Sequence, residues 1–260
     1  NKKLYKHIKI VIFGRVPKMT KRRNAMSIYT IGDLHLSFEK DKPMDIFGDN
    51  WKNHEEKIKE DWIKKVKEND LVVLPGDFSW ATYLQDAYKD FEYLNNLPGK
   101  KLLLKGNHDY WWTTLTSMRK FLDENHLKNI DFVYNNAYEF ENVIITGTRG
   151  WGQVEEENDE KLLKREQLRL ELSLQDGIKK YGEDKEIIVF MHYPPITSAQ
   201  IIKNETNEFI DILKKYNIKK CYYGHLHSVA IKEAVTGEYF GIDFELVSAD
   251  GVDFKLVKVN

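Results

Sequence analysis

Five histidines and three aspartates, residue types that bind metal ions and move protons, fall into a few short motifs of this chain. Only three of its eight histidines lie outside them. In chain order the motifs are Asp33-Leu34-His35, Gly76-Asp77, Gly106-Asn107-His108-Asp109, His192 and Gly224-His225-Leu226-His227. Each motif follows a short apolar run, which places it at the end of an expected strand. Open α/β sheets put their active sites at that edge.

The side chains in these motifs are ligands for hard or borderline divalent cations. Asp33 and His35 are two residues apart, so in a strand they would face the same side, and His225 and His227 repeat that spacing. A pair of ions about 3.5–4 Å apart needs a bridging carboxylate and can then clamp both oxygens of an in-line displacement. The set predicts a two-metal hydrolase that cuts a phosphoester.

Each motif alone also has an ordinary structural explanation. Gly76-Asp77 is typical of a turn, residues 106–109 could form an Asn-rich turn, and residues 224–227 could hold two surface histidines. Their common order and their positions after apolar runs favour the metal site. The preceding glycines suit turns in which the backbone passes close to a ligand. His54 and His126 lie among charges on expected helices, so we expect both at the surface.

The hydrophobic pattern from Ser27 onward is that of an α/β protein. Strands are expected at 27–31, 71–74, 101–104, 132–134, 143–146, 186–191 and 219–223. Helices are expected at 54–69, 83–97, 113–125, 159–181 and 205–216. Three more strands, at 230–235, 238–248 and 254–259, are expected from the intervening turns. Without repeats or linkers, residues 26–260 are expected to form one domain whose last strands are antiparallel.

Composition limits the class of protein. The chain has 260 residues, 42% of them hydrophobic and 31% charged, which suffices for one large core or two small domains. A net charge of -1 gives no overall attraction to nucleic acid or membranes. No segment approaches the ~20 apolar residues of a membrane span. Cys221, the one cysteine, is expected to be a buried inert thiol in a reducing compartment, and therefore in the cytoplasm.

Residues 1–25 form a basic leader with nine Lys or Arg and no Asp or Glu. Its apolar run is too short and too interrupted for a signal peptide. The dipeptide Arg22-Arg23 before Met26 is what a purine-rich ribosome-binding site would encode if translated. Two interpretations stay open: mis-annotated upstream sequence with Met26 as the natural start, or a disordered basic arm.

The ordered motifs resemble the calcineurin-like metallophosphoesterase superfamily. That family's pattern is Asp-x-His, Gly-Asp, Gly-Asn-His-Asp or Glu, a His, and Gly-His-x-His, and all five blocks occur here between about Ile28 and Ser228. The resemblance implies an α/β fold that is a four-layer α-β-β-α sandwich with two mixed sheets. It also implies two divalent metal ions, with Mn²⁺ as the expected ion and Fe, Zn or Co as alternatives.

The resemblance further implies a role for each matching residue. The first metal would be held by Asp33, His35 and His227, Asp77 would bridge, and the second would be held by Asn107, His192 and His225. His108 would stand over the scissile phosphate and protonate the leaving oxygen, with Asp109 orienting and charging its imidazole. The nucleophile would be a hydroxide that bridges the metals.

The sequence departs from one branch of the family. Gly76-Asp77 is followed by Phe78-Ser79-Trp80, not by the Asp-Arg-Gly of the protein Ser/Thr phosphatases, and their arginine blocks are missing. A phosphoprotein phosphatase of that type is therefore not expected. The match is to the wider, mostly bacterial branch, whose substrates range from nucleotides and nucleic acids to lipids and small phosphoesters.

Aromatic residues follow several motifs and are candidates for contact with the substrate. Trp80 and Tyr110 are the predicted substrate-binding aromatics, by stacking on a base, and packing at the rim or in the core is the alternative. Arg149 lies between Thr148 and Gly150, after an expected strand, and a guanidinium suits bidentate phosphate binding.

Three functions are compatible with the motifs. The first is a metal-dependent phosphoesterase acting on a small phosphomonoester or phosphodiester. The second is a nuclease-like phosphodiesterase, against which the near-zero net charge counts. The third is a non-catalytic metal-binding scaffold, which should lack a ligand or His108, and neither is missing. The sequence does not define the oligomeric state.

Overall fold

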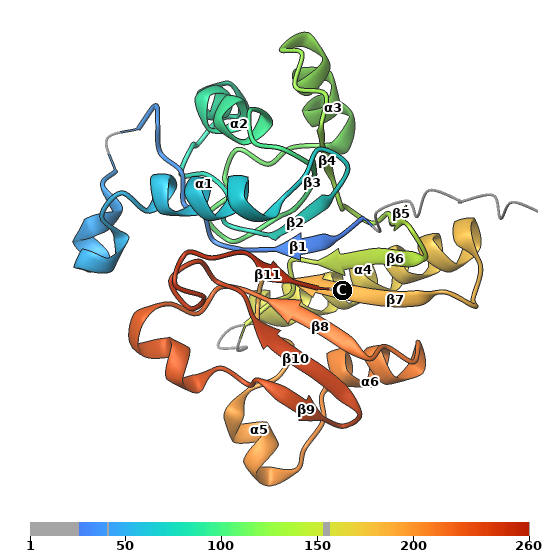
Figure 1. Cartoon of the computed structure of the whole chain (residues 1–260). Coiled ribbons are helices and arrows are strands. Elements are labelled where there is room, and N and C mark those ends of the chain that lie inside the picture. The colour runs from blue at the N-terminus through green and yellow to red at the C-terminus, as the bar shows by residue number, and fades with distance from the viewer. Residues whose placement is uncertain (1–25, 41, 153–156, 260) are drawn as a thin grey trace, which may run out of the picture.

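The strands form two sheets that lie face to face (Figure 1). The computed structural model describes residues 26–40, 42–152 and 157–259, so the predicted leader lies outside the described residues. The first sheet has the order β11-β1-β2-β3-β4 and contains β1 (Ile28–Thr30), β2 (Leu71–Pro75), β3 (Lys100–Leu104), β4 (Ile130–Phe132) and β11 (Val257–Lys258). Strands β1 to β4 are parallel, and β11 is antiparallel to β1.

The second sheet has the order β5-β6-β7-β8-β10-β9. It contains β5 (Tyr138–Phe140), β6 (Val143–Thr148), β7 (Glu186–Met191), β8 (Lys220–Tyr223), β9 (Gly237–Tyr239) and β10 (Ile242–Leu246). The four inner strands are parallel, and the two edge strands, β5 and β9, are antiparallel to their neighbours. Both sheets are therefore mixed, as predicted.

Helices cover the outer face of each sheet (Figure 1). Those of the first sheet are α1 (His54–Lys65), α2 (Tyr88–Asn95) and α3 (Leu115–Glu124), and those of the second are α4 (Glu157–Tyr181), α5 (Ser198–Lys203) and α6 (Glu208–Lys215). The loops carry four short 3-10 helices: η1 (Met44–Phe47), η2 (Asp49–Trp51), η3 (Leu84–Ala87) and η4 (Ser228–Glu233). The predicted four-layer α-β-β-α sandwich is confirmed.

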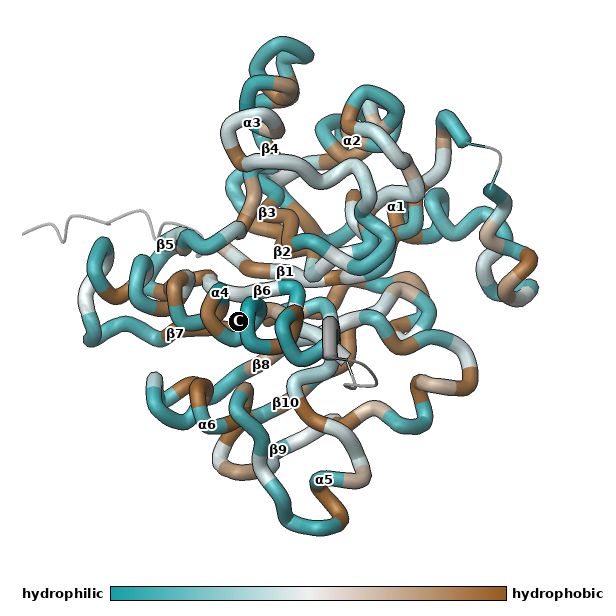
Figure 2. The backbone as a smooth tube through the Cα atoms, turned by 180° about the vertical axis from the view of Figure 1, so that it is seen from behind, coloured by the Kyte–Doolittle hydropathy of each residue, from teal (hydrophilic) through white to brown (hydrophobic). Residues whose placement is uncertain are grey.

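Strand β2 shows how the sequence builds this layering. Leu71 and Val73 pack into the core between the sheets, whereas Val72 and Leu74 pack under the helices of the first sheet. Successive strand residues point to opposite faces, so a strand covered on both sides needs an uninterrupted apolar run. Figure 2 shows hydrophobic residues along the inner strands and hydrophilic ones on the outer helices.

Several local predictions were wrong. Residues 230–235, predicted as a strand, lie mostly in the 3-10 helix η4, and β5 and α5 were not predicted. The predicted helix 83–97 is divided into η3 and α2. The apolar spacing in 54–69 predicts that Ile63 shares a buried face with Ile58 and Trp62, but Ile63 is 58% exposed. The boundaries of these elements depend on tertiary contacts that periodicity does not report.

The longest helix, α4, has one buried face. Leu170 and Leu174 are fully buried against the second sheet, while Leu168 and Leu172 on other faces are 62% and 50% exposed. In the described part of the chain, no helix combines the length and apolar character needed to cross a membrane. Cys221, in β8, is fully buried as predicted, and burial raises the pKa of its thiol.

Lys101, in β3, is a buried cation that should make stability depend on pH. Its side chain is 1% exposed and its ammonium donates to the carbonyl of Leu97. Burial lowers its pKa to about 7, against about 10.4 in an unfolded chain. The unfolded state therefore binds one more proton between these values, and the free energy of unfolding should rise by roughly 3–5 kcal/mol from pH 7 to pH 10.

Denaturant titrations at pH 6.5 and pH 9.5 test this prediction. Lys101→Met should remove most of the rise, because it has no ammonium to desolvate. Lys100→Met changes an exposed neighbour and should keep the wild-type pH dependence. Equal pH dependence in wild type and Lys101→Met would contradict the prediction.

Candidate active site

The seven predicted metal ligands converge where the carboxyl ends of the parallel strands of both sheets meet. Three of the motifs follow β1, β2 and β3 of the first sheet, and two follow β7 and β8 of the second. Hydrogen bonds join the two sheets here: the Gly32 N–H donates to Val247 O at 2.7 Å, and the His225 N–H donates to the Asp33 carboxylate at 3.0 Å. Motifs that are far apart in the sequence therefore lie in one cluster in the folded protein.

The backbone at four of these ligands is left-handed. Asp33, His35, Asp77 and His225 have φ of 58°, 47°, 49° and 73°. Such values are uncommon for residues other than glycine, and they concentrate at functional sites. Asp33 and His35 were expected to share a strand face, but β1 ends at Thr30, so loop geometry and not strand pleating brings them together.

Two glycines make the close packing of these loops possible, as predicted. A Cβ atom at Gly106 would lie 2.1 Å from Oδ1 of Asp77, and one at Gly224 would lie 2.1 Å from Oδ2 of Asp33. Both distances are far inside van der Waals contact. Any larger residue at these positions would displace a candidate ligand.

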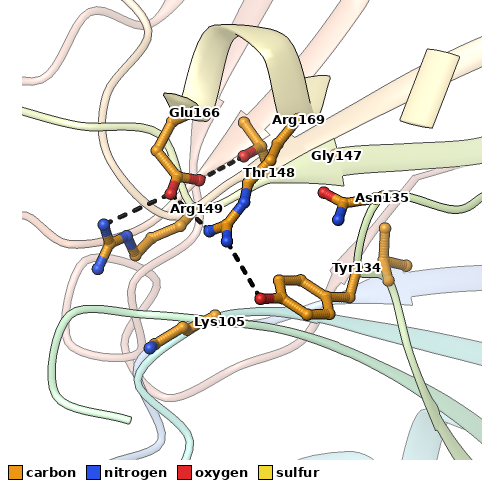
Figure 3. Close-up of a pocket in the computed structure, with 9 residues that line it drawn as sticks. Lys105, Tyr134, Asn135, Gly147, Thr148, Arg149, Glu166 and Arg169 are labelled. Atoms are coloured by element: carbon orange, nitrogen blue, oxygen red, sulfur yellow. Dashed lines mark hydrogen bonds and ion pairs between the residues drawn. The ribbon is translucent and has the colours of Figure 1, made fainter. Parts of the chain in front are cut away.

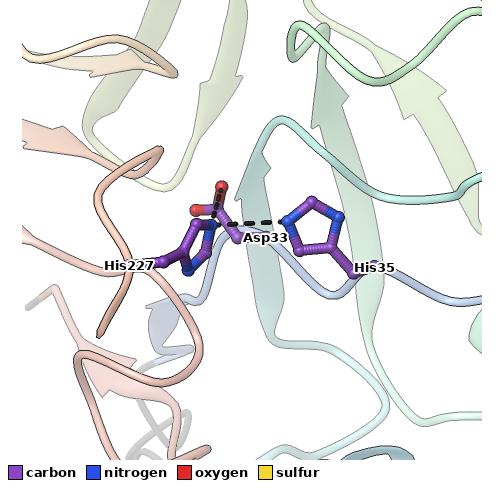
Figure 4. Close-up of side chains that lie close together, drawn as sticks. All are labelled: Asp33, His35 and His227. Atoms are coloured by element: carbon purple, nitrogen blue, oxygen red, sulfur yellow. Dashed lines mark hydrogen bonds and ion pairs between the residues drawn. The ribbon is translucent and has the colours of Figure 1, made fainter. Parts of the chain in front are cut away.

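The first group of ligand atoms comes from Asp33, His35 and His227 (Figure 4). Nε2 of His227 lies 3.3 Å from Oδ1 of Asp33 and 3.4 Å from Nε2 of His35. Asp33 and His35 are buried, and the His227 side chain is 27% exposed. One carboxylate oxygen and two imidazole nitrogens thus face a common point.

The second group consists of Asn107, His192 and His225. Oδ1 of Asn107 lies 2.6 Å from Nε2 of His192 and 2.9 Å from Nδ1 of His225, and these two nitrogens are 3.2 Å apart. Nδ1 of His192 donates to the carbonyl of Pro75 at 3.1 Å, which leaves Nε2 with its lone pair in the neutral ring. Oδ1 of Asn107 and this nitrogen are then two acceptor atoms that face each other, an arrangement that a cation beside them would stabilise.

Asp77 lies between the two groups. Its Oδ2 is 3.8 Å from Nε2 of His35 and 3.6 Å from Nε2 of His192, so the same oxygen faces both. Burial, together with the negative charges of Asp109 and Asp33, raises the pKa of Asp77 well above its usual range. Cations beside this carboxylate would compensate that crowding of negative charge. The position fits the predicted bridging ligand.

Three of the four candidate histidine ligands, His35, His192 and His225, are in the protonation state that binds metal. Burial lowers the pKa of His192 and of His225 to about 3, and it also lowers the pKa of His35 well below its usual value. Their rings are neutral near pH 7, and a neutral imidazole nitrogen is a ligand for Mn, Fe, Zn or Co. The donor set therefore fits two divalent cations.

Asp250 also belongs to the site, although it is not among the residues predicted from the sequence. Its Oδ1 accepts from Nδ1 of His227 at 2.7 Å, which turns Nε2 toward Asp33. Burial opposes protonation of His227, but the hydrogen bonds with Asp250 and Asp33 prevail and raise its pKa to about 10. The surroundings of His227, formed by the carboxylates of Asp33 and Asp250, therefore strongly favour a positive charge. In the sequence, Asp250-Gly251 is a pair typical of a turn, and its type and spacing do not indicate a site residue.

His108 is placed beside both ligand groups without belonging to either. Its ring centroid is 5.8 Å from that of His35 and 4.4 Å from that of Trp80. Its Nδ1 is buried and has no hydrogen-bond partner among the described residues. Burial and the charge of Lys42 lower the pKa of His108. The imidazole is neutral here, so it must first take up a proton before it can donate one to a group bound at the site.

The expected pairing of Asp109 with His108 is not found. The Asp109 carboxylate is fully buried and accepts five hydrogen bonds, none of them from the His108 ring. The donors are Nε1 of Trp111 and the backbone N–H groups of Gly106, Asp77, Phe78 and Ser79, at 2.7–3.2 Å. All of its acceptor capacity is directed at the two ligand loops. In this structure Asp109 organises the loops and does not orient His108.

Trp80 forms one wall of the site. Its ring stacks on His35 at 4.8 Å, and Nζ of Lys42 lies 3.0 Å from its ring centroid. Tyr110 is 65% exposed, with its ring 6.3 Å from that of His108. Both aromatics are placed where a substrate could contact them, and this contact stays a prediction. Lys42, in an irregular loop, carried no signal in the sequence.

Other aromatics that follow the motifs pack inside the protein. Phe78 and Trp111 are fully buried and Trp112 is 7% exposed, so core packing is their role. Tyr193 differs from them, because it is half-buried and its ring lies 4.1 Å from that of His225.

Arg149 lies next to a buried carboxylate (Figure 3). Its Nη2 is 3.5 Å from Oε1 of Glu166, and its guanidinium is 4.6 Å from the ring centroid of Trp151. Nε and Nη2 are buried without a hydrogen-bond partner among the described residues. The Arg149 carbonyl accepts from the backbone N–H of His192, which couples β6 to the second ligand group. Contact with the substrate phosphate stays a prediction.

His54 was expected at the surface and is instead 5% exposed. Its Nε2 lies 3.0 Å from the carbonyl of Leu34, and its Nδ1 lies 3.2 Å from that of Trp51. The Trp51 ring packs edge-on against His35 and His227 at 5.9 and 5.7 Å. Trp51 therefore packs against the first ligand group, and His54 holds the backbone next to it. The charged neighbours of His54 in the sequence had predicted a surface position instead.

Comparison with known proteins agrees with this geometry. The family model for calcineurin-like phosphoesterases matches residues 26–229. A search of curated proteins gives no match. Among solved structures, the phosphopantetheinyl hydrolase PptH from Mycobacterium tuberculosis is 12% identical, with a TM-score of 0.55, over 90% of this chain and 95% of its own. TT1561 of Thermus thermophilus is 14% identical, with a TM-score of 0.49, over 90% and 98%.

At these identities the structural likeness concerns the fold alone. The family match is broader evidence, because it spans most of the chain and includes His108 and all seven candidate ligands. Metal-dependent phosphoester hydrolysis is the general activity of that family. The chain belongs to the calcineurin-like phosphoesterase family.

Proposed function

We propose that this protein is a dimetal phosphohydrolase acting on a small phosphomonoester or phosphodiester. The observation that carries the proposal is the position of Asp77, whose Oδ2 faces one imidazole of each ligand group. A carboxylate placed in this way binds two cations side by side. Manganese is the expected metal, and the same donor set accepts Fe, Zn or Co.

The residues around the metal site have separate tasks in this proposal. The two cations, when bound, would lower the pKa of water and neutralise charge on the phosphate. His108 lies outside both ligand groups and would donate a proton to the leaving oxygen. Lys42, over Trp80, adds a positive charge beside His108 and would attract an anionic substrate. Trp80 and His35 hold this side of the site by stacking.

Two alternatives receive less support. A nuclease-like phosphodiesterase needs a basic groove to follow a nucleic acid backbone, and the net charge of -1 supplies no general attraction. A non-catalytic scaffold is expected to have lost a ligand or His108, whereas the sequence keeps His108 and all seven candidate ligands. The name of PptH, a phosphopantetheinyl hydrolase, is compatible with a phosphate-containing substrate.

The first test is hydrolysis of p-nitrophenyl phosphate and bis-p-nitrophenyl phosphate with and without added Mn²⁺. Chelated protein should be inactive, and Mn²⁺ should restore turnover. His108→Ala should lower kcat about a hundredfold, as expected for loss of a general acid. Its metal content should stay at the wild-type level, because His108 is not a ligand in the proposal.

His126→Ala is the matched control, since this histidine is exposed and remote in sequence from every motif. It should keep wild-type turnover. Loaded protein that binds two Mn²⁺ ions and hydrolyses neither ester would count against the proposal and favour the scaffold. Preference for one ester would distinguish a monoesterase from a diesterase.

A further inference from the structure

A groove of about 560 Å³ opens beside the second ligand group. Its lining comes from the segments that follow β6, β7 and β8 and from the helices α4, α5 and α6. Among the residues that line it are Trp151, Leu163, Tyr193, Phe209, His225 and Leu226. The volume is within the range of pockets that bind small organic molecules.

The groove is continuous with the metal site through aromatic rings. The ring of Tyr193 lies 4.1 Å from that of the ligand His225, and the ring of Trp151 lies 5.6 Å from that of Tyr193. A phosphate held at the second ligand group would therefore have this wall beside it. Any organic group attached to that phosphate would meet the groove first on this side.

The polar side chains of the lining are largely occupied with one another. Oε1 of Gln200 accepts from the Thr197 N–H at 3.1 Å and from Nδ2 of Asn207 at 3.3 Å. Oγ1 of Thr197 accepts from the Gln200 N–H, and Oδ1 of Asn207 caps α6 by accepting from the Ile210 N–H. These bonds fix the end of the groove. Among the other lining residues, Gln167, Glu208 and His225 are polar, and the rest are aromatic, aliphatic, proline or glycine residues.

The charge of the lining restricts its occupant. Within the part of the chain that the structure describes, Glu208 is the one acidic side chain of the lining, and no Lys or Arg belongs to it. The guanidinium of Arg149 stands behind Trp151 and interacts with Glu166. A second phosphate or a carboxylate would thus find no cation in the groove, whereas an apolar group would be removed from water.

We propose that this groove is the subsite for the organic group of the phosphoester, and that this group is apolar and uncharged. The proposal rests on the proposed function and deepens it by naming the substrate class. It assigns a specificity role to Tyr193, Trp151 and Leu163. A polyanionic chain such as a nucleic acid does not fit the charge of this lining.

The test is binding of n-alkylphosphonates, from methyl to hexyl, to the Mn²⁺-loaded protein by titration calorimetry. The phosphonate head stays constant, and only the apolar tail changes. One fully buried CH₂ group is worth roughly a fourfold gain in affinity. With part of the tail buried, hexylphosphonate should bind at least tenfold more tightly than methylphosphonate.

Two leucines of α4 provide a matched pair of variants. Leu163 lines the groove and is half-buried, whereas Leu168 on the same helix is 62% exposed and is not part of the lining. Leu163→Glu should remove most of the dependence on tail length, measured as the ratio of the affinities for hexyl- and methylphosphonate within the same variant. Leu168→Glu carries the same charge and should behave as wild type.

Each outcome decides for or against the groove. Equal affinities for methyl- and hexylphosphonate in wild type, or equal effects of the two leucine variants, would overturn the proposal. So would tighter binding of 6-phosphonohexanoate, whose tail ends in a carboxylate, than of hexylphosphonate. Turnover of p-nitrophenyl phosphate is measured separately, so a protein that hydrolyses esters but ignores tail length refutes the subsite alone.

Discussion

Replacing Asp109 with asparagine is expected to lower the free energy of unfolding by about 3–5 kcal/mol, because two or three buried N–H donors would lose their acceptor. Oδ2 of Asp109 accepts from Gly106 and Asp77, and Oδ1 accepts from Phe78, Ser79 and Trp111. An amide has one acceptor oxygen, so its NH₂ group would face N–H donors on one side or the other. The ligand loops would shift, and turnover should fall with stability.

Urea denaturation of the metal-free variant measures this effect apart from catalysis. Asp123→Asn makes the same chemical change at an exposed position of α3 and should leave stability within about 0.5 kcal/mol of wild type. If Asp109 acted only as the partner of His108, Asp109→Asn would keep wild-type stability and lose only kcat. That result would restore the expectation drawn from the family pattern and contradict the hydrogen bonds described above.

Asp109 also shows which feature of the site could not be predicted from the sequence, namely the hydrogen-bond partners of a buried side chain. The types and order of the motif residues were sufficient to predict seven candidate ligands whose side chains do converge. Strand ends are local features, and parallel sheets bring such ends to one edge. The donors that a buried carboxylate binds are not a local feature of the sequence, because they depend on which N–H groups the folded loops bring close to it. Asp250 was missed for the same reason, since its partner His227 lies 23 residues away, and so was the contact of His54 with Leu34, which lies 20 residues away.

The fold was predictable where burial on both faces leaves a strong pattern. Strands β2 and β7 are apolar over most of their length because they lie between two hydrophobic layers. Prediction failed in the segment after the last motif, where residues 230–235 have strand-like composition. Most of that segment lies in η4, none of whose residues is buried, so it lacks the burial that a strand in the sheet would have.

Asp77→Asn is expected to lower turnover about a thousandfold, a loss of roughly 4 kcal/mol of transition-state stabilisation. Asparagine has the same shape and keeps an oxygen for the backbone N–H of His108, which now donates to Oδ1 of Asp77 at 2.8 Å. It lacks the negative charge that faces both ligand groups. The buried carboxylates of Asp33 and Asp109 would lose a repulsive neighbour, so the metal-free variant should be at least as stable as wild type.

Titration with Mn²⁺ separates the bridging position from an ordinary ligand position. His35→Ala removes a ligand of the first group and His225→Ala removes one of the second, so each should weaken one binding event by tenfold or more and leave the other nearly unchanged. Asp77→Asn should weaken both, because its Oδ2 lies 3.8 Å from His35 and 3.6 Å from His192. A variant that binds two ions with wild-type affinity would mean that Asp77 holds the loops together electrostatically without joining the two sites.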